Sequence, residues 1–193
     1  MFELLNDDSV STIYCLTRRA SSLDAVLNSL AEKDLYVDPE QMKKIVAFDS
    51  CLDKPDFGLT LEEGMIRHML DSVSLIIRTA WPVNFNLPLT ESEPHIKGLY
   101  NLIQFSLSVH RREPAVMMFS SSVSTALGSP SDEIPEKPIA LDCALMGYGQ
   151  SKLVGERIVS NARHSGARAY SLRIGRSWVT LRKACGMTPK LYR

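Results

Sequence analysis

The chain has 193 residues, of which 45% are hydrophobic, a size and composition that suit a single globular domain. Its 22 basic and 22 acidic residues give zero formal net charge, which argues against a broad electrostatic surface for nucleic acid or an anionic membrane. Arg78 interrupts the best apolar run, at 73–83, so no segment is long enough to span a bilayer.

Short β-branched runs alternate along the chain with longer stretches of helical period, as is typical of βαβ units and a parallel sheet. After a helical turn at 2–5, the first half contains a strand at 10–16, a helix capped by Ser22, a strand at 44–48, a helix at 61–70 and a strand at 73–77. The second half contains a helix that starts at Pro94, a strand at 115–119, a helix at 148–164 and a strand at 169–174. This order predicts an α/β fold with a doubly wound, Rossmann-like parallel sheet.

The sharpest local signal is the segment Gly-Tyr-Gly-Gln-Ser-Lys at 147–152. On a helix, Tyr148 and Lys152 are one turn apart and face the same way. An ammonium at that distance stabilises a phenolate and makes the phenol a better acid–base group at neutral pH. The spacing alone is weak evidence, because roughly one tyrosine in fifteen has a lysine four residues later by chance.

Upstream of this pair, an apolar strand runs directly into the hydroxyls of Ser120, Ser121 and Ser122. Ligands of an open α/β sheet lie at the carboxyl ends of its strands, so we expect these hydroxyls near a site. Ser122 could donate a hydrogen bond to a carbonyl oxygen as negative charge develops on it. For Ser120 and Ser121 the simpler interpretation is that they end the strand and begin a turn.

With Ser-Ser followed by Tyr-x-x-x-Lys, the chain resembles the extended short-chain dehydrogenase/reductases. It is most similar to the thioester reductase domains, also called male-sterility-type NAD-binding domains, that end fungal nonribosomal peptide synthetase-like and carboxylic acid reductase enzymes. The segments Lys-Pro-Asp-Phe-Gly-Leu at 54–59 and Trp-Pro-Val-Asn-Phe at 81–85 are the most specific part of this resemblance. The likeness extends from about Ile13 to Gly175.

The resemblance implies an enzyme that reduces a thioester to an aldehyde with NADPH. The acyl chain would arrive on the phosphopantetheine arm of an acyl carrier protein. By position, Tyr148 would donate a proton to the carbonyl oxygen, and Ser122 would polarise that carbonyl. Lys152 would tune Tyr148 and hold the ribose next to the nicotinamide.

The resemblance also implies four further cofactor contacts. Arg18, which follows the first expected strand, would receive the 2′-phosphate of NADP, with Arg19 as a helper. A solvated strand end is an equally good interpretation of these two arginines. Asp49 would lie near the adenine, and Ala80 would lie in a turn that lines the cofactor.

The sequence departs from the family at the phosphate-binding end. The family pattern begins with a strand and a glycine-rich turn that places the pyrophosphate at a helix N-terminus, whereas the first glycine here is Gly58. We therefore expect the first strand and this loop to be missing. In the 3-2-1-4-5-6 strand order the first strand lies in the middle of the sheet. Without it, either its two neighbouring strands pair directly with each other or the chain folds poorly. In addition, Cys51 occupies a position where the family usually has an aspartate near the adenine, and Arg78-Thr79 replaces the His-Asn that the family usually has before the alanine.

We expect a partial reductase domain at 1–175 and an unpatterned basic tail at 176–193, with no substrate-binding lobe. Two alternatives stay open: a non-catalytic remnant that binds no cofactor, and a sugar-nucleotide epimerase or dehydratase of the same superfamily. The histidines lack metal-ligand spacing, so no metal is expected, and neither is a nucleic-acid or membrane partner. Four widely spaced cysteines and an acidic start without a secretory signal predict a cytoplasmic protein without disulfides.

Overall fold

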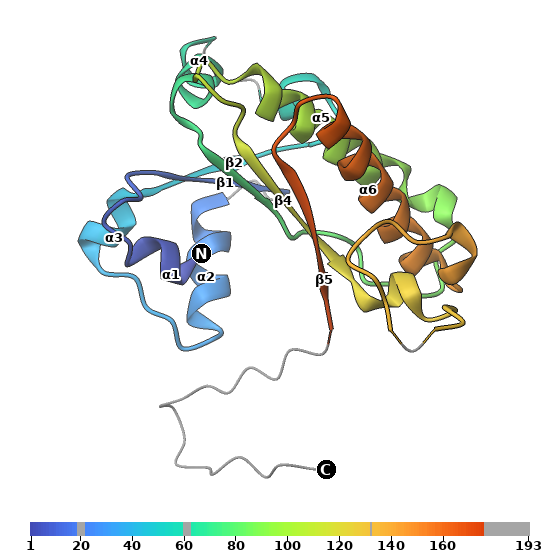
Figure 1. Cartoon of the computed structure of the whole chain (residues 1–193). Helices are drawn as coiled ribbons and strands as arrows, with labels where there is room; N and C mark the ends of the chain where they lie inside the picture. Colours follow the sequence, from blue (N-terminus) through green and yellow to red (C-terminus); the bar gives the residue numbers. More distant parts are fainter. Residues whose placement is uncertain (19–21, 60–62, 132, 176–193) are drawn as a thin grey trace. The chain divides into compact units, whose positions relative to one another are not determined.

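The computed structural model describes residues 1–18, 22–59, 63–131 and 133–175 (Figure 1). These residues form two compact units, Met1–Ser50 and Cys51–Gly175. Every strand pairing within each unit is parallel, and helices follow the strands along the chain. The predicted α/β class with a parallel sheet arrangement is therefore confirmed. No helix among the described residues has the length and apolar character that a membrane crossing requires.

The first unit is built on two parallel strands. Thr17, at the end of the first strand, lies opposite Asp49, at the end of the second. A small apolar core of Leu5, Val26 and Ile45 holds the helices on this pair of strands. The elements are α1 (Phe2–Leu5), β1 (Ile13–Thr17), α2 (Ser22–Ala31), α3 (Pro39–Lys43) and β2 (Ile45–Asp49).

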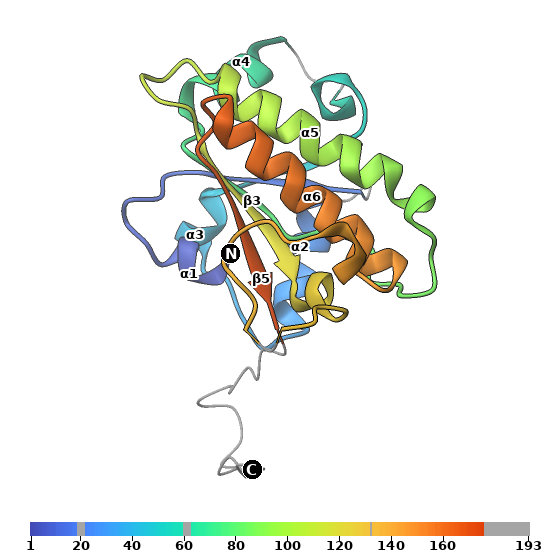
Figure 2. The same ribbon diagram turned by 45° about the vertical axis from the view of Figure 1, so that its right-hand side comes forward.

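The second unit contains three parallel strands in the order β3-β4-β5, so β4 is central. Two long helices, α5 and α6, lie side by side over one face of this sheet (Figure 2). The strands and α-helices of this unit are α4 (Glu63–Ser72), β3 (Leu75–Arg78), α5 (Glu93–Ser108), β4 (Val116–Ser122), α6 (Gly147–His164) and β5 (Ala169–Ile174). Short 3-10 turns connect them, namely η1 (Pro55–Gly58), η2 (Leu89–Ser92), η3 (Val123–Ala126) and η4 (Leu141–Cys143).

The core of the second unit lies between β4 and the two long helices. Met117 and Phe119 alternate along β4 with more exposed residues and are 0% exposed, as the two-residue period of a strand requires. Leu99 of α5 and Leu153 of α6 are also 0% exposed. Burial of such side chains stabilises each by roughly 1.5–3 kcal/mol, so this layer fixes where α6 lies on the sheet.

Strand β4 continues through the serines, which corrects the expectation that it ends at Phe119. Ser120, Ser121 and Ser122 pair with residues of β5, so they belong to the sheet and not to a turn. The cross-strand hydrogen bonds override the turn preference of serine. The hydroxyls therefore stand on a rigid strand at its carboxyl end.

The strands on either side of the expected first strand do not pair with each other. The described strands form a two-stranded sheet, β1-β2, and a three-stranded sheet, β3-β4-β5. Strands β1 and β3 therefore do not pair directly. Direct pairing was one of the two outcomes expected from the sequence, and it is wrong. Each unit instead has a sheet of its own, with β1 and β2 in the first and β3, β4 and β5 in the second.

Candidate active site

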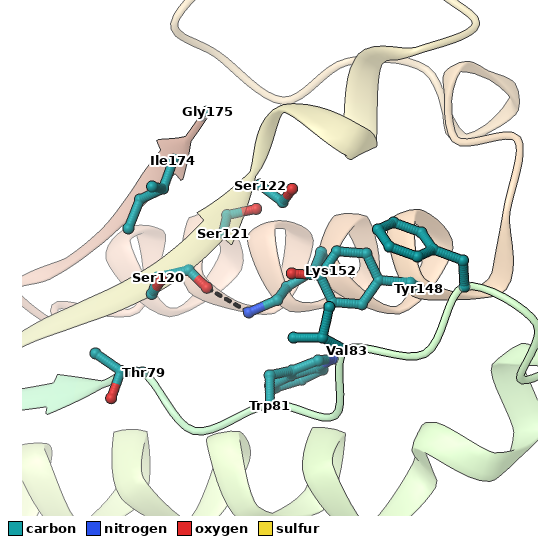
Figure 3. A pocket seen from close by; sticks show the side chains of 11 residues that line it. Thr79, Trp81, Val83, Ser120, Ser121, Ser122, Tyr148, Lys152, Ile174 and Gly175 are labelled. Atoms are coloured by element: carbon teal, nitrogen blue, oxygen red, sulfur yellow. Dashed lines mark hydrogen bonds between the residues drawn. The ribbon is translucent and has the colours of Figure 1, made fainter. Parts of the chain in front are cut away.

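A hollow of about 300 Å³ lies at the carboxyl end of β4 (Figure 3). Its lining includes Ser122, Tyr148 and Lys152, the three residues that the sequence singled out for catalysis, so the fold brings them together. This position agrees with the rule that ligands of open α/β sheets bind beyond the carboxyl ends of the strands. The rest of the lining is Thr79, Trp81, Val83, Phe85, Ser120, Ser121, Ile174 and Gly175.

Lys152 reaches from α6 to the end of β4. The residue is only 2% exposed, and its Nζ donates a hydrogen bond to the carbonyl oxygen of Ser120 at 2.5 Å (Figure 3). Aromatic rings surround the ammonium: Nζ lies 4.8 Å from the ring centre of Trp81, 4.9 Å from Phe119 and 5.8 Å from Tyr148. The amine is thus held at one position in a largely apolar environment.

That environment changes the charge of the amine. Burial, and then the positive charge of Arg78, lower the pKa of Lys152 from its ordinary value to about 8. The aromatic faces favour the ammonium and oppose this shift. An amine with a pKa near 8 is present in both protonation states near neutral pH, which suits a group that passes a proton or tunes a neighbour.

Trp81 is a part of the site to which the sequence assigned no role. Its indole N–H donates to the Ser151 hydroxyl at 3.0 Å, and this hydroxyl donates to the backbone carbonyl of Tyr148 at 2.8 Å. The ring also packs edge-on against Phe119 at 5.3 Å. The Trp-Pro-Val-Asn-Phe segment served only as a family signature, although a tryptophan just past a strand end was a usable signal.

Tyr148 stands in the first turn of α6, where its ring packs edge-on against Phe85 at 5.0 Å. The helix comes very close to its neighbours at this point. A Cβ added at Gly149 would lie 2.5 Å from the backbone carbonyl oxygen of Ser124. Backbone cannot move aside as a flexible side chain can, so only glycine at this position lets the first turn of α6, which carries Tyr148, pack this close to Ser124.

We therefore expect Gly149→Ala to lower the free energy of unfolding by about 1–3 kcal/mol, the usual cost of overpacking. Chemical denaturation followed by circular dichroism measures this. Gly64→Ala is the matched control, because a Cβ at Gly64 of α4 meets nothing within 4 Å. It should leave stability unchanged or raise it slightly, since alanine favours a helix. Equal stability of the two variants would contradict the close packing of α6.

Ser122 lies where β4 ends and η3 begins. Its Oγ accepts a hydrogen bond from the backbone N–H of Ser124 at 3.2 Å, so its own proton can be donated to a ligand in the hollow. The hydroxyl of Ser121, by contrast, donates a hydrogen bond to the carboxylate of Glu156 at 2.5 Å. The two neighbouring hydroxyls therefore have different surroundings: Ser121 donates to a buried carboxylate, whereas Ser122 accepts from a backbone N–H.

Glu156 is the centre of a buried polar network that sequence reasoning missed. The carboxylate is 4% exposed and also accepts three hydrogen bonds from Arg173 of β5, one from Nη2 at 2.7 Å and two from Nε at 3.0 and 3.2 Å. Arg173 donates further to the backbone carbonyls of Pro135 and Lys137, at 2.9 and 3.1 Å. One ion pair thus ties β4, β5 and α6 to the loop that precedes η4.

The residues expected at the cofactor lie in different parts of the molecule. Arg18 is exposed just after β1, and Asp49 is exposed at the end of β2, so both stand at the carboxyl end of the first sheet. Arg19 lies outside the described residues. Ala80 is exposed after β3 and does not line the hollow, although Thr79 and Trp81 on either side of it do.

The residues present fit one end of a nicotinamide cofactor. The amine of Lys152 and the phenol of Tyr148 border the hollow, where a ribose and its ring could be held. Within the described ranges, no glycine-rich turn is available for the pyrophosphate, since the first glycine is Gly58. The same ranges contain no group of three His, Cys, Asp or Glu side chains arranged to hold a metal ion.

Comparison with known proteins adds a family and a fold. The model of the family described as Male sterility protein, an NAD-binding type, matches residues 1–177. The chain is 34% identical over 179 residues to adenylate-forming reductase Nps10 of Heterobasidion annosum, a match over 89% of this chain and 16% of that protein. It is 33% identical over 170 residues to the carboxylic acid reductase of Neurospora crassa, over 86% of this chain and 16% of that protein.

Among solved structures, the terminal R domain from the myxalamid PKS-NRPS biosynthetic pathway superposes with a TM-score of 0.77 at 23% identity. The match covers 91% of this chain and 44% of that domain. It establishes the Rossmann-like fold that the sequence predicted. The chain therefore spans about a sixth of the length of these curated relatives and under half of this structural neighbour.

Proposed function

We propose a function from the premise that this chain belongs to the Male sterility protein family: it is part of a reductase domain that uses NADPH to convert a thioester into an aldehyde. One observation carries the proposal. A phenol, an amine and a hydroxyl, from Tyr148, Lys152 and Ser122, line a single hollow at the carboxyl end of β4. Reduction of a carbonyl requires a proton donor and a hydrogen-bond donor at its oxygen, and these residues provide both.

In the proposed reaction each of these residues has a separate task. Ser122 donates a hydrogen bond to the thioester carbonyl oxygen and stabilises the negative charge that develops there. Tyr148 donates the proton to that oxygen, and Lys152, one helical turn away, favours the phenolate that remains. When bound, NADPH would supply the hydride to the carbonyl carbon, and Lys152 together with the turn at Ala80 would hold the nicotinamide ribose. The C–S bond of the resulting hemithioacetal then breaks, and its hydroxyl proton passes to the sulfur, so that the thiol leaves and the aldehyde remains.

The finer features of the cofactor and partner are also proposals. The family is one of NAD-binding domains, and we assign NADP because Arg18 and Arg19 follow β1, where a guanidinium can pair with a 2′-phosphate. Asp49 would contact the adenine side. The acyl group would be presented on the phosphopantetheine arm of a carrier protein. No disulfide joins the described cysteines Cys15, Cys51 and Cys143, and we propose a reducing, cytoplasmic setting.

The 193-residue chain by itself should bind NADPH very weakly. Pyrophosphate contacts supply much of the affinity for a dinucleotide, and the described residues include no glycine-rich turn at a helix N-terminus to make them. A titration that follows NADPH fluorescence should show no saturation below about 1 mM, which corresponds to roughly 4 kcal/mol of binding free energy. An intact NADPH-dependent reductase serves as the positive control. Saturation at micromolar concentrations would contradict this expectation.

A chimera tests the proposed activity directly. Residues 1–175 would replace the matching segment of the Neurospora crassa carboxylic acid reductase, which is 33% identical over 170 residues. We expect the chimera to release aldehyde from a carrier-bound or pantetheine thioester in the presence of NADPH, measured by chromatography. A chimera that folds and binds NADPH but releases no aldehyde would refute the proposed function and favour a non-catalytic remnant.

A further inference from the structure

We propose that Lys152 is a covalent binding site for uncharged aldehydes, whose carbonyl carbon forms a reversible imine with the amine in the hollow at the end of β4. The geometry is the starting point. Nζ borders a hollow of about 300 Å³ and is fixed there by one hydrogen bond to the Ser120 carbonyl, at 2.5 Å. A neutral amine that donates one proton to this carbonyl keeps its lone pair for an electrophile that enters the hollow.

The charges around the amine favour its nucleophilic form. The described side chains that line the hollow include no carboxylate, so no anion there holds Lys152 as an ammonium. The charged or titratable groups around it include Arg78 at the end of β3 and Tyr148 on α6. Glu156 lies one turn further along α6, but its carboxylate is paired with Arg173 at 2.7 Å. Burial and Arg78 lower the pKa of Lys152 to about 8, so its neutral fraction near pH 7 is on the order of a hundred times that of an exposed lysine.

The walls of the hollow select the kind of aldehyde. Trp81, Val83, Phe85 and Ile174 present apolar surface, and the volume of about 300 Å³ is sufficient for an aromatic or short aliphatic group. A charged aldehyde would lose its hydration against these walls without gaining a partner of opposite charge other than the amine itself. The ligand class is therefore an uncharged aldehyde of benzaldehyde size.

The reaction is a condensation without oxidation or reduction. The nitrogen lone pair attacks the aldehyde carbon, a C–N bond forms, and the carbonyl oxygen takes up a proton to give a carbinolamine. That hydroxyl then leaves as water as the C=N bond forms and nitrogen gives up its second proton. Tyr148 and Ser122, which line the same hollow, can supply the proton that assists the loss of water.

This site goes beyond the proposed reductase activity, because imine formation requires neither NADPH nor turnover. If the parent domain does release an aldehyde here, the same amine would retain part of that product reversibly. A failure of the imine experiment and a failure of the chimera are therefore separate results.

Reductive trapping tests the proposal on the full chain. The protein would be incubated at pH 7 with benzaldehyde and sodium cyanoborohydride, without NADPH, and benzylated lysines would be quantified by peptide mass spectrometry. Lys97, exposed on α5 of the same unit, is the internal reference. We expect labelling of Lys152 to exceed that of Lys97 at least tenfold. Labelling of Lys152 equal to or below that of Lys97 would overturn the proposal.

Two further variants test the role of the hollow without a substitution at Lys152. Val83→Asp places a carboxylate on the wall of the hollow, where it would hold the ammonium and disfavour an apolar ligand. Labelling of Lys152 should fall about tenfold while that of Lys97 stays constant. Leu141→Asp is the matched control, since Leu141 is 63% exposed against 69% for Val83 and does not line the hollow. Equal labelling of Lys152 in both variants would show that the hollow does not admit the aldehyde.

Discussion

Glu156→Ala is expected to lower the free energy of unfolding by about 3–5 kcal/mol, the cost of removing one partner from a buried ion pair. The substitution leaves the Arg173 guanidinium, whose side chain is only 17% exposed, without its carboxylate. It also removes the acceptor of the Ser121 hydroxyl inside the sheet. Since domains have total stabilities of only about 5–15 kcal/mol, such a loss should be plain in a urea or thermal unfolding curve.

The chain contains a suitable comparison for this variant. Glu113 and Arg168 form an ion pair with a similar distance, 2.6 Å, but their side chains are 64% and 47% exposed. Exposed pairs contribute about 0–1 kcal/mol, so Glu113→Ala should hardly change the unfolding curve. If the two variants lost equal stability, burial could not be the cause, and the central role of Glu156 would have to be abandoned.

The Glu156 network also affects the site. It holds the hydroxyl of Ser121, the residue before Ser122, in one position. Through Arg173 it also holds the backbone carbonyls of Pro135 and Lys137. We therefore expect Glu156→Gln, which keeps the shape but not the charge, to fold and yet loosen the loop before η4. Hydrogen exchange of the backbone amides around 133–137 would be faster in that variant than in the unmodified protein.

Much of this architecture could be predicted because local patterns carry it. Helical period places a helix at 148–164, and the structure has α6 over Gly147–His164. Alternation of strand and helix implied parallel pairing, which holds in both units. The four-residue spacing of Tyr148 and Lys152, followed back to Ser122, was enough to identify three side chains that share a hollow. Spacing along one helix and the rule for strand ends are local and general, so a single sequence carries both.

What the sequence did not reveal depends on contacts between distant residues. Nothing near Ser121 indicates that a carboxylate 35 positions later will bury itself against it. The strand was expected to stop at Phe119 because serine favours turns, whereas pairing with β5 carries it to Ser122. The short helix α3 was missed because five residues carry no period, although Asp38 and Gln41 form a recognisable capping box and Pro39 stands in the first turn.

Tyr148→Phe, made in the chimera that carries residues 1–175, should lower the rate of aldehyde release by about 10²–10⁴-fold, the usual contribution of a positioned proton donor. Phenylalanine keeps the ring and hence the edge-on contact with Phe85 at 5.0 Å. The change removes only the hydroxyl, so the helix and the wall of the hollow should remain as they are. NADPH affinity, measured by fluorescence titration, should therefore be nearly unchanged.

A second tyrosine separates the loss of the phenol at the site from the general effect of the substitution. Tyr100 lies on α5 and is 52% exposed, and Tyr100→Phe removes the same atom away from the hollow. It should leave the rate within about twofold of the parent chimera, since exposed surface substitutions usually change stability by under about 0.5 kcal/mol. A Tyr148→Phe chimera as active as the Tyr100→Phe chimera would exclude Tyr148 as the proton donor. Lys152 and Ser122, which line the same hollow, would then be the next candidates for the proton donor, and the role of each could be tested in the same chimera.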